Sequence, residues 1–399
     1  MERVVGFPKG YAWGSASAIH ELVGTDPDGS PLAELWFGAH PSASARLVDS
    51  AEDLASAIEA DPSGTLGADV AARFGAQLPY LLKLIAPDQP LSLQVHPSLE
   101  RARERFAAED AAGIPVDAPH RNYRDPNHKP ELVFALTTFD ALCGFRAPRR
   151  AAELLENLDA PLARSLYRTL ADDPSSEGVR AAFTSLLHED TRPSAAEVAE
   201  VVEACAARFT QGSPSPRADA IVVLLGQEYP DDPGVVTSLL LNPVTLQPGE
   251  SLFIPAGGVH AYLSGLGVEV MASSDNVLRA GLTSKHIDVP EMLDCVDYVA
   301  APPIRIAPEV FHGATRVYYA PVDDFELSIT TLSDGGSPNG PCPLPGRGPR
   351  MLLCLDGELD VTSSTDGLRL GRGQAAFVRG DEGPLSISGR GTLVQADVP

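Results

Sequence analysis

The chain has 399 residues, of which 44% are hydrophobic, and its formal net charge is −24. This length predicts two or three domains with cores of ordinary size, and the acidity disfavours nucleic acid and anionic membranes, because both need a basic face. The five cysteines include no C-x-x-C pair, which argues against a disulfide framework and against a thiolate zinc site. We expect a cytoplasmic protein, since the first residues lack an apolar signal region and no apolar run could span a bilayer.

The first part of the chain, to about Phe145, mixes short strand-like runs with a helical stretch from Asp49 to Phe74. Ser50 and Asp53 form an S-x-x-D signal for the start of that stretch. The sequence therefore predicts a first β unit that carries some helix.

The second part of the chain, from Arg146 to Gly212, has apolar residues at helical spacing and no strand alternation. Ser194 and Glu197 form a capping box, which is followed by an apolar stripe from Val198 to Phe209. We expect a small helical domain whose apolar stripe is its core.

The third part returns to β structure after the Ser/Pro-rich linker at 212–216, beginning with the apolar run AIVVLLG at 220–226. From about Phe311 a further β-rich stretch repeats the same rhythm. Residues 373–378 look like a degenerate copy of residues 249–254, and the repeat contributes no candidate metal ligand. This pattern predicts a non-catalytic copy of the preceding β unit.

Four potential metal ligands lie in strand-like runs: Gln94, His96, Glu131 and His260. Because alternate residues of a strand point the same way, Gln94 and His96 can share one ion. Two imidazoles, one carboxylate and one amide oxygen suit a borderline divalent ion such as zinc, although these ligands also admit iron, manganese or cobalt. We expect the interior of one barrel to collect all four groups.

The spacing from Gly249 to His260 follows G-x5-P-x-G-x2-H, which resembles the second motif of the cupins. In the first cupin motif Gln94 takes the usual first histidine position, and an insertion from Pro97 to Pro130 displaces the glutamate. The expected fold is mainly β, with one metal-bearing cupin (jelly-roll) barrel, an inserted helical domain and a degenerate C-terminal barrel. The expected domains are a catalytic cupin (1–145 plus 213–310), a helical domain (146–212) and a cupin-like domain (311–399).

Several long blocks in the right order resemble the type I mannose-6-phosphate isomerases. They are YAWGSASAI, LAELWFGAHP, PYLLKLIAPDQPLSLQVHPS, YRDPNHKPELVFAL and HAYLSGLGVEVMASSDNVLRAGLTSKHIDV. The resemblance implies one zinc ion per chain and the interconversion of D-mannose 6-phosphate and D-fructose 6-phosphate through an enediol. It also implies a proton shuttle at Lys129, ring opening at His128, and a sugar- or phosphate-facing role for Lys83.

The chemistry of such an isomerase needs a proton moved between C1 and C2, and a metal that stabilises negative charge as a Lewis acid. Lys129 fits the proton transfer because a lysine beside a cation in a dry cleft loses its proton more readily. Arg279 can hold an enediolate or phosphate oxygen with two parallel hydrogen bonds. Each has a structural alternative, since Lys129 could pair with an acid at the strand edge and Arg279 could anchor a loop.

Weaker candidates complete the site. Glu269 is isolated among apolar residues and is either an acid/base group or an organiser of Lys and Arg. Tyr262 and Asn276 are candidates for lining the substrate cleft beside Lys83. The remaining histidines are expected to be surface or structural groups, with His286 left open.

Two rival functions belong to other classes. One is a catalytically silent cupin that binds a phosphosugar as a sensor, and the other is an iron-dependent cupin dioxygenase. The complete ligand set with Lys129 and Arg279 favours the enzyme over the sensor, and the glutamine ligand disfavours the dioxygenase. A sugar phosphate is the expected partner, and the chain is expected to be a monomer or a weak oligomer.

Overall fold

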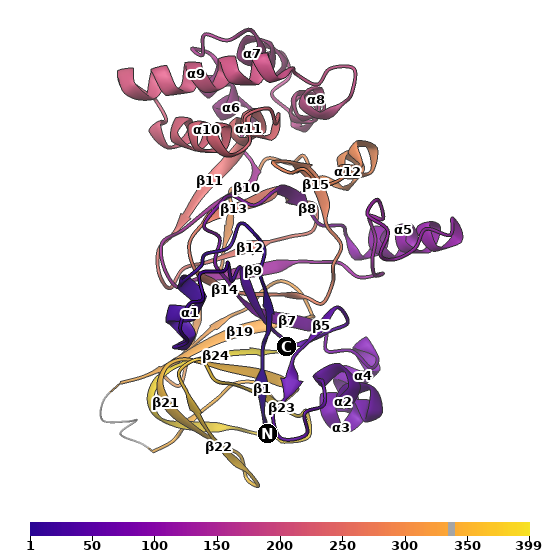
Figure 1. The fold of residues 1–399 in the computed structure, drawn as a ribbon, viewed down its shortest axis with the longest axis vertical. Helices are drawn as coiled ribbons and strands as arrows, with labels where there is room; N and C mark the ends of the chain where they lie inside the picture. Colours follow the sequence, from indigo (N-terminus) through magenta and orange to yellow (C-terminus); the bar gives the residue numbers. More distant parts are fainter. Residues whose placement is uncertain (334–339) are drawn as a thin grey trace.

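The computed structural model describes residues 1–333 and 340–399. Figure 1 shows three units along the long axis, with a group of helices at one end, two facing sheets in the middle and a large sheet at the other end. The fold is thus a mixture of helices with several antiparallel sheets. Among the described residues, no helix is both long enough and apolar enough to cross a membrane.

One sheet of the middle unit has seven strands, in the order β16-β12-β9-β14-β7-β3-β2. Its strands are β2 (Phe7–Lys9), β3 (Glu34–Phe37), β7 (Tyr80–Ile85), β9 (Glu131–Ala135), β12 (Ser251–Ile254), β14 (Gly267–Ala272) and β16 (Ile304–Arg305).

The facing sheet has five strands, in the order β11-β10-β13-β8-β15. Its strands are β8 (Leu93–Val95), β10 (Phe139–Phe145), β11 (Leu241–Leu246), β13 (His260–Ser264) and β15 (Leu278–Gly281). A separate hairpin joins β4 (Ala39–His40) to β5 (Ala43–Ser44).

The ten-stranded sheet forms the C-terminal unit. Its strands are β1 (Glu2–Val5), β6 (Arg46–Leu47), β17 (Glu309–Phe311), β18 (Thr315–Tyr318), β19 (Glu326–Leu332), β20 (Cys342–Pro343), β21 (Arg350–Thr362), β22 (Gly367–Gly371), β23 (Ala375–Val378) and β24 (Ser386–Asp397). The N-terminal strand β1 pairs with β23, so the chain starts in this sheet rather than in the first β unit to which the sequence pattern assigned it. Pairing between residues far apart in the sequence leaves no local signal.

The described residues contain two groups of helices and three single helices. The group at the end of the molecule contains α6 (Pro148–Leu155), α7 (Pro161–Asp172), α8 (Ser176–Leu187), α9 (Ala195–Gly212), α10 (Pro216–Glu228), α11 (Gly234–Thr237) and the 3-10 turn η1 (Ser238–Leu240). The others are α1 (Ala18–Val23), the group α2 (Leu54–Ala60), α3 (Pro62–Leu66) and α4 (Ala68–Phe74), and the single helices α5 (Leu99–Ala111) and α12 (Val289–Cys295).

The capping box at Ser194 and Glu197 is confirmed, but the expected apolar stripe ends early, because Phe209 is 49% exposed. The expected strand at 220–226 is wrong, because these residues belong to α10. Ile221, Val222 and Leu225 are buried at helical spacing, and a short apolar run does not by itself distinguish a buried strand from a helix. Helical structure therefore continues to Leu240.

The helical stretch expected at 49–74 is present as α2, α3 and α4, and it begins later than the sequence signal indicated. The side chain of Asp53 caps α2 by accepting from the Ser56 amide, whereas the Ser50 hydroxyl lies 3.4 Å from a Glu2 carboxylate oxygen. The cap is therefore Asp53, the second residue of the S-x-x-D signal.

The seven-stranded sheet has two different faces because side chains alternate along each strand. On one face, residues such as Phe37, Leu82, Leu132 and Val270 join a core that includes residues of the C-terminal sheet. The opposite face packs against the five-stranded sheet through a second core that includes Ile85. The polar residues of the site project from this second face.

A buried tyrosine of the middle unit forms hydrogen bonds with the backbone of the C-terminal unit. The Tyr80 hydroxyl lies 3.0 Å from the carbonyl oxygen of Pro349 and 2.9 Å from that of Ala396. We predict that Tyr80→Phe lowers the free energy of unfolding by about 1–3 kcal/mol, because it removes a buried donor that bonds a backbone carbonyl of the C-terminal unit. Urea unfolding measures this change, with Tyr319→Phe as the control, since Tyr319 is 51% exposed. Equal stability of the two variants would contradict the prediction.

Candidate active site with a metal centre

The predicted metal ligands come from both sheets of the middle unit. Gln94 lies on β8 and pairs in register with His260 on β13, and His96 follows the end of β8. Glu131 begins β9 in the seven-stranded sheet. The two sheets thus bring residues that are up to 166 positions apart into one place.

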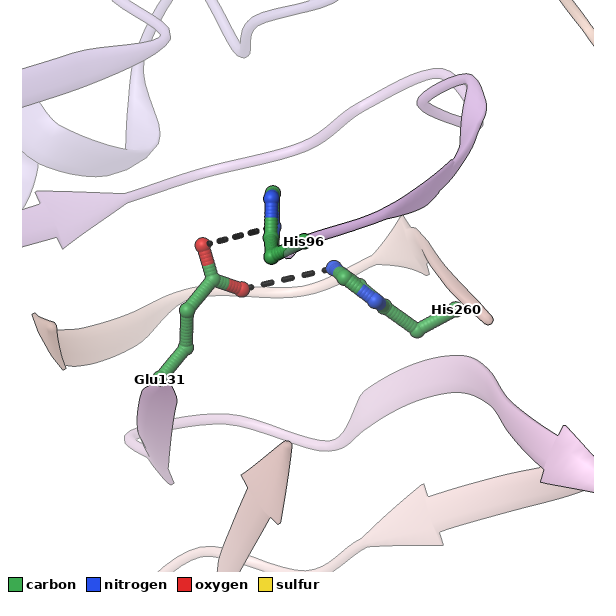
Figure 2. Close-up of side chains that lie close together, drawn as sticks. All are labelled: His96, Glu131 and His260. Carbon is green, nitrogen blue, oxygen red and sulfur yellow. Dashed lines mark ion pairs between the residues drawn. The ribbon is translucent and has the colours of Figure 1, made fainter. Parts of the chain in front are cut away.

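The Glu131 carboxylate faces both imidazoles, with one oxygen directed at each ring (Figure 2). Its two carboxylate oxygens are each 3.3 Å from a histidine nitrogen, one from Nε2 of His96 and the other from Nε2 of His260. One ligand atom from each residue lies within 4.8 Å of the others, and all three residues are buried.

The protons of the two imidazoles are directed away from Glu131. Nδ1 of His96 lies 2.8 Å from the carbonyl oxygen of Asn276, and Nδ1 of His260 lies 3.0 Å from that of Gly258. A neutral ring that donates through Nδ1 presents a lone pair at Nε2. The lone pairs of both rings therefore face carboxylate oxygens, and neither Nε2 of His96 nor one Glu131 oxygen has a hydrogen-bond partner among the described residues.

The ionisation of these groups matches a cation site. Burial, together with the nearby Lys129, lowers the pKa of His96 to about 4, so this ring is neutral at pH 7. Burial alone would raise the pKa of Glu131, but Lys129 and His96 hold it well below its usual range. A carboxylate and neutral imidazoles with converging lone pairs are the donor set of a divalent transition metal.

Gln94 can complete the set. Its Nε2 lies 3.2 Å from Nε2 of His260, so a half-turn of the amide brings Oε1 towards the same point. Hydrogen bonds from ligand histidines to backbone carbonyls fix the ring orientation in many metal sites, and both rings have one here. The four residues therefore fit one ion.

A cavity of about 560 Å³ opens beside this cluster and is lined by Gln94 and Glu131. Its wall also carries the cations Arg124, Arg279 and Lys285. Burial lowers the pKa of Arg279, and Arg124 lowers it further, while Lys285 has its pKa lowered by burial and by both arginines. In the described parts of the chain these three cations form no ion pair, so they can accept an anion.

Arg279 lies directly opposite Gln94, because β15 pairs with β8 at that register. The position puts the guanidinium beside a predicted metal ligand and on the wall of the cavity. The alternative role of Arg279 as a loop anchor would require a protein acceptor, and the structure gives it none among the described residues.

A row of polar side chains crosses the seven-stranded sheet. Lys83 on β7 pairs in register with Trp36 on β3 and with Glu269 on β14. Its Nζ lies 2.5 Å from a Glu269 oxygen and 3.4 Å from a Glu34 oxygen. Burial lowers the pKa of Lys83, but Glu269 and Glu34 outweigh burial and raise it above its usual value. Lys83 therefore stays charged.

Two further predicted residues line the cavity. Lys129 places its Nζ 3.0 Å from a Glu131 oxygen, next to the metal ligands. The Tyr262 hydroxyl donates to Glu269 at 2.7 Å, and burial raises the pKa of Glu269 even though Lys83 lowers it. Lys129, Tyr262 and Glu269 thus lie around one cavity.

Two predicted residues lie elsewhere. His128 is not part of the cavity wall, and its Nε2 lies 2.9 Å from Asp324, which precedes β19. Asn276 is fully buried, and its amide bonds the backbone of residues 124, 125 and 127. Both contacts hold the segment ahead of Glu131, and neither residue is among those that line the cavity.

Sequence reasoning did not identify three wall residues, Glu34, Arg124 and Lys285. Glu34 accepts the Trp36 indole N–H at 2.8 Å and faces Lys83. Its position two residues before Trp36 on the same strand could have suggested a shared face. The loop cations Arg124 and Lys285 gave no periodic signal.

Comparison with known proteins agrees with this site. The family described as "Phosphomannose isomerase type I, catalytic domain" matches residues 3–148. A mannose-6-phosphate isomerase of Escherichia coli (strain K12) is 40% identical over 400 residues, covering 99% of each chain. Another from Arabidopsis thaliana is 33% identical over 396 residues, covering 91% of this chain and 86% of its own.

Solved structures extend the comparison to the fold. The apo form of mannose 6-phosphate isomerase from Salmonella typhimurium is similar with a TM-score of 0.88 and 38% identity, and the match covers 100% of this chain and 99% of that one. A mannose 6-phosphate isomerase bound with zinc and yttrium gives the same TM-score, identity and coverage. Since similarity at this level extends over essentially the whole chain, the protein belongs to the type I phosphomannose isomerase family.

Proposed function

We propose that this protein is a zinc-dependent aldose-ketose isomerase that interconverts D-mannose 6-phosphate and D-fructose 6-phosphate. The observation that carries the proposal is one cavity lined by Glu131, which clusters with His96 and His260, by cations without an ion pair among the described residues, and by the buried polar row of Lys83. Zinc held by these ligands and Gln94 would supply Lewis-acid polarisation of a substrate oxygen.

The cations on the cavity wall suit a phosphate. Besides burial, Arg124 lowers the pKa of Arg279, and both arginines lower the pKa of Lys285, so a phosphate dianion would relieve this repulsion. A local cluster of this kind can bind an anion although the chain is acidic overall, because salt screens the distant carboxylates over about 8 Å.

The two lysines have different roles in this proposal. Lys83, fixed between Glu34 and Glu269, remains protonated and can hold a sugar oxygen as a donor. Lys129 contacts the Glu131 carboxylate and lines the cavity beside the metal ligands, so it is our candidate for moving the proton between C1 and C2. Arg279 would stabilise negative charge on the enediolate.

A catalytically silent phosphosugar sensor is the alternative. It would account for the cations on the cavity wall but not for a buried lysine placed to move a proton. A sensor has no need for Lys129 next to the ligand Glu131. Full-length relatives in this family are named as isomerases, which also favours the enzyme. We retain a cytoplasmic location as part of this proposal.

We also propose that the two facing sheets form a cupin barrel and that the C-terminal unit is its degenerate copy. The turns before β12 and β23 support this, because Gly249 and Gly373 both have positive φ. In each turn the next side chain, Glu250 or Gln374, accepts from the backbone N–H three residues earlier. Domain limits near residues 146, 240 and 311 fit this division, with β1 and β6 in the C-terminal unit.

The first prediction from this proposal concerns the reaction. Zinc-loaded protein is expected to form fructose 6-phosphate from mannose 6-phosphate, and to stop after chelation until zinc is restored. In heavy water the product should gain some deuterium at C1, because the base can exchange its proton before returning it. Mannose without phosphate should react poorly. Folded, zinc-replete protein that forms no ketose phosphate would leave the sensor as the better account.

The second prediction concerns the metal ligands. His96→Ala should weaken zinc binding by at least about 10²-fold, since losing an outer-shell partner alone typically weakens a site by 10- to 100-fold. Zinc titration of metal-free protein measures the affinity. His188→Ala is the matched control, because the His188 side chain is 51% exposed in the helical unit. Equal zinc affinity in both variants would show that His96 is not a ligand.

The third prediction concerns Arg279. Arg279→Lys keeps a positive charge but loses the two parallel donors, so kcat should fall by about 10²-fold or more. Zinc content should be unchanged. If only KM rises, then Arg279 holds the ground-state substrate and contributes nothing specific to the transition state.

A further inference from the structure

The C-terminal unit reaches the segment that precedes the metal ligand Glu131. Asp324, just ahead of β19, is 5% exposed, and its Oδ2 lies 2.9 Å from Nε2 of His128. Such a short contact between a buried carboxylate and an imidazole fixes the orientation of the ring.

The other side of the same segment is bonded to residues 272–276 of the middle unit. The Pro130 carbonyl accepts from the backbone N–H of Ala272 at 3.1 Å, and the Asn127 carbonyl accepts from the side-chain amide of Asn276 at 2.9 Å. Residues 127–130 are therefore held from two sides. Backbone hydrogen bonds hold them to the middle unit, and the contact between the Asp324 and His128 side chains holds them to the C-terminal unit.

This support bears directly on Lys129. The two neighbouring side chains have different surroundings: His128 faces Asp324, while Lys129 lines the cavity with its Nζ 3.0 Å from Glu131. Fixing the His128 ring thus fixes the direction of the next side chain.

We infer that Asp324 is a positioning residue for the isomerase reaction, acting through His128 to aim Lys129 at the substrate. The inference rests on the proposed function, and it gives the C-terminal unit a part in the active site. It also assigns His128 to this support rather than to contact with the sugar, in agreement with its place outside the cavity wall.

The test compares Asp324→Ala with Asp323→Ala, the adjacent acid, whose residue is exposed. Asp324→Ala should lower kcat on the order of tenfold, because small displacements of a catalytic group cost rate while substrate contacts remain. KM and zinc content should stay close to those of the unmodified protein. Asp323→Ala should have full activity. Asp324→Asn, which keeps an acceptor for His128, should recover most of the rate.

A double-variant cycle separates positioning from direct contact. If both residues act as one support, His128→Ala should lose about as much kcat as Asp324→Ala, and the double variant should lose little more. A much larger loss in His128→Ala, or independent losses that multiply, would overturn the inference by showing that His128 acts on its own.

Hydrogen exchange gives a readout that does not depend on activity. The backbone amides of residues 124, 125, 127 and 128 should exchange faster in Asp324→Ala than in Asp323→Ala, because the segment loses one support. If Asp324→Ala does not fold, kcat and exchange are compared instead between His128→Ala, Asp324→Asn and Asp323→Ala. Unchanged kcat and exchange in folded Asp324→Ala would refute the inference, whereas an inactive unmodified protein with faster exchange in the variant would refute only the proposed function.

Discussion

The rest of the site depends on three converging sets of lone pairs inside the middle unit. His96 and His260 donate their Nδ1 protons to backbone carbonyls and turn Nε2 towards the Glu131 carboxylate, all within 4.8 Å. Without a cation, such an arrangement places acceptor against acceptor in a buried space, which is unfavourable. A divalent ion removes the conflict. The fold keeps these acceptor groups close together because they come from two sheets whose packing fixes their separation.

The same sheet that presents Glu131 to the cavity packs its other face onto the C-terminal unit. Period-two alternation puts Lys83 and Glu269 in the site while Leu82 and Val270 fill the shared core. The C-terminal sheet thus supports the strands that carry the chemistry, and its Asp324 also contacts the segment ahead of Glu131. A unit that supplies no predicted ligand can therefore contribute to catalysis through the positions of other residues.

The sequence allowed the family and the metal-ligand cluster to be predicted, because spacing and alternation are local properties that survive folding. The membership in the isomerase family is confirmed. The run at 220–226 was misassigned because an apolar run shorter than two helical turns carries no distinguishing period. The contacts of His128 and Asn276 could not be predicted, because their partners lie 196 and about 150 residues away and no local pattern reports such contacts.

The most direct measurement of the central claim is zinc X-ray absorption on the loaded protein, with and without mannose 6-phosphate. The account predicts a first shell of nitrogen and oxygen only, with two imidazoles, and a change in that shell when the sugar phosphate is added. Cys143 lies opposite His260 in register, but burial raises the pKa of its thiol to about 12, so no sulfur is expected. A sulfur ligand at about 2.3 Å, or a shell unaffected by substrate, would contradict the account.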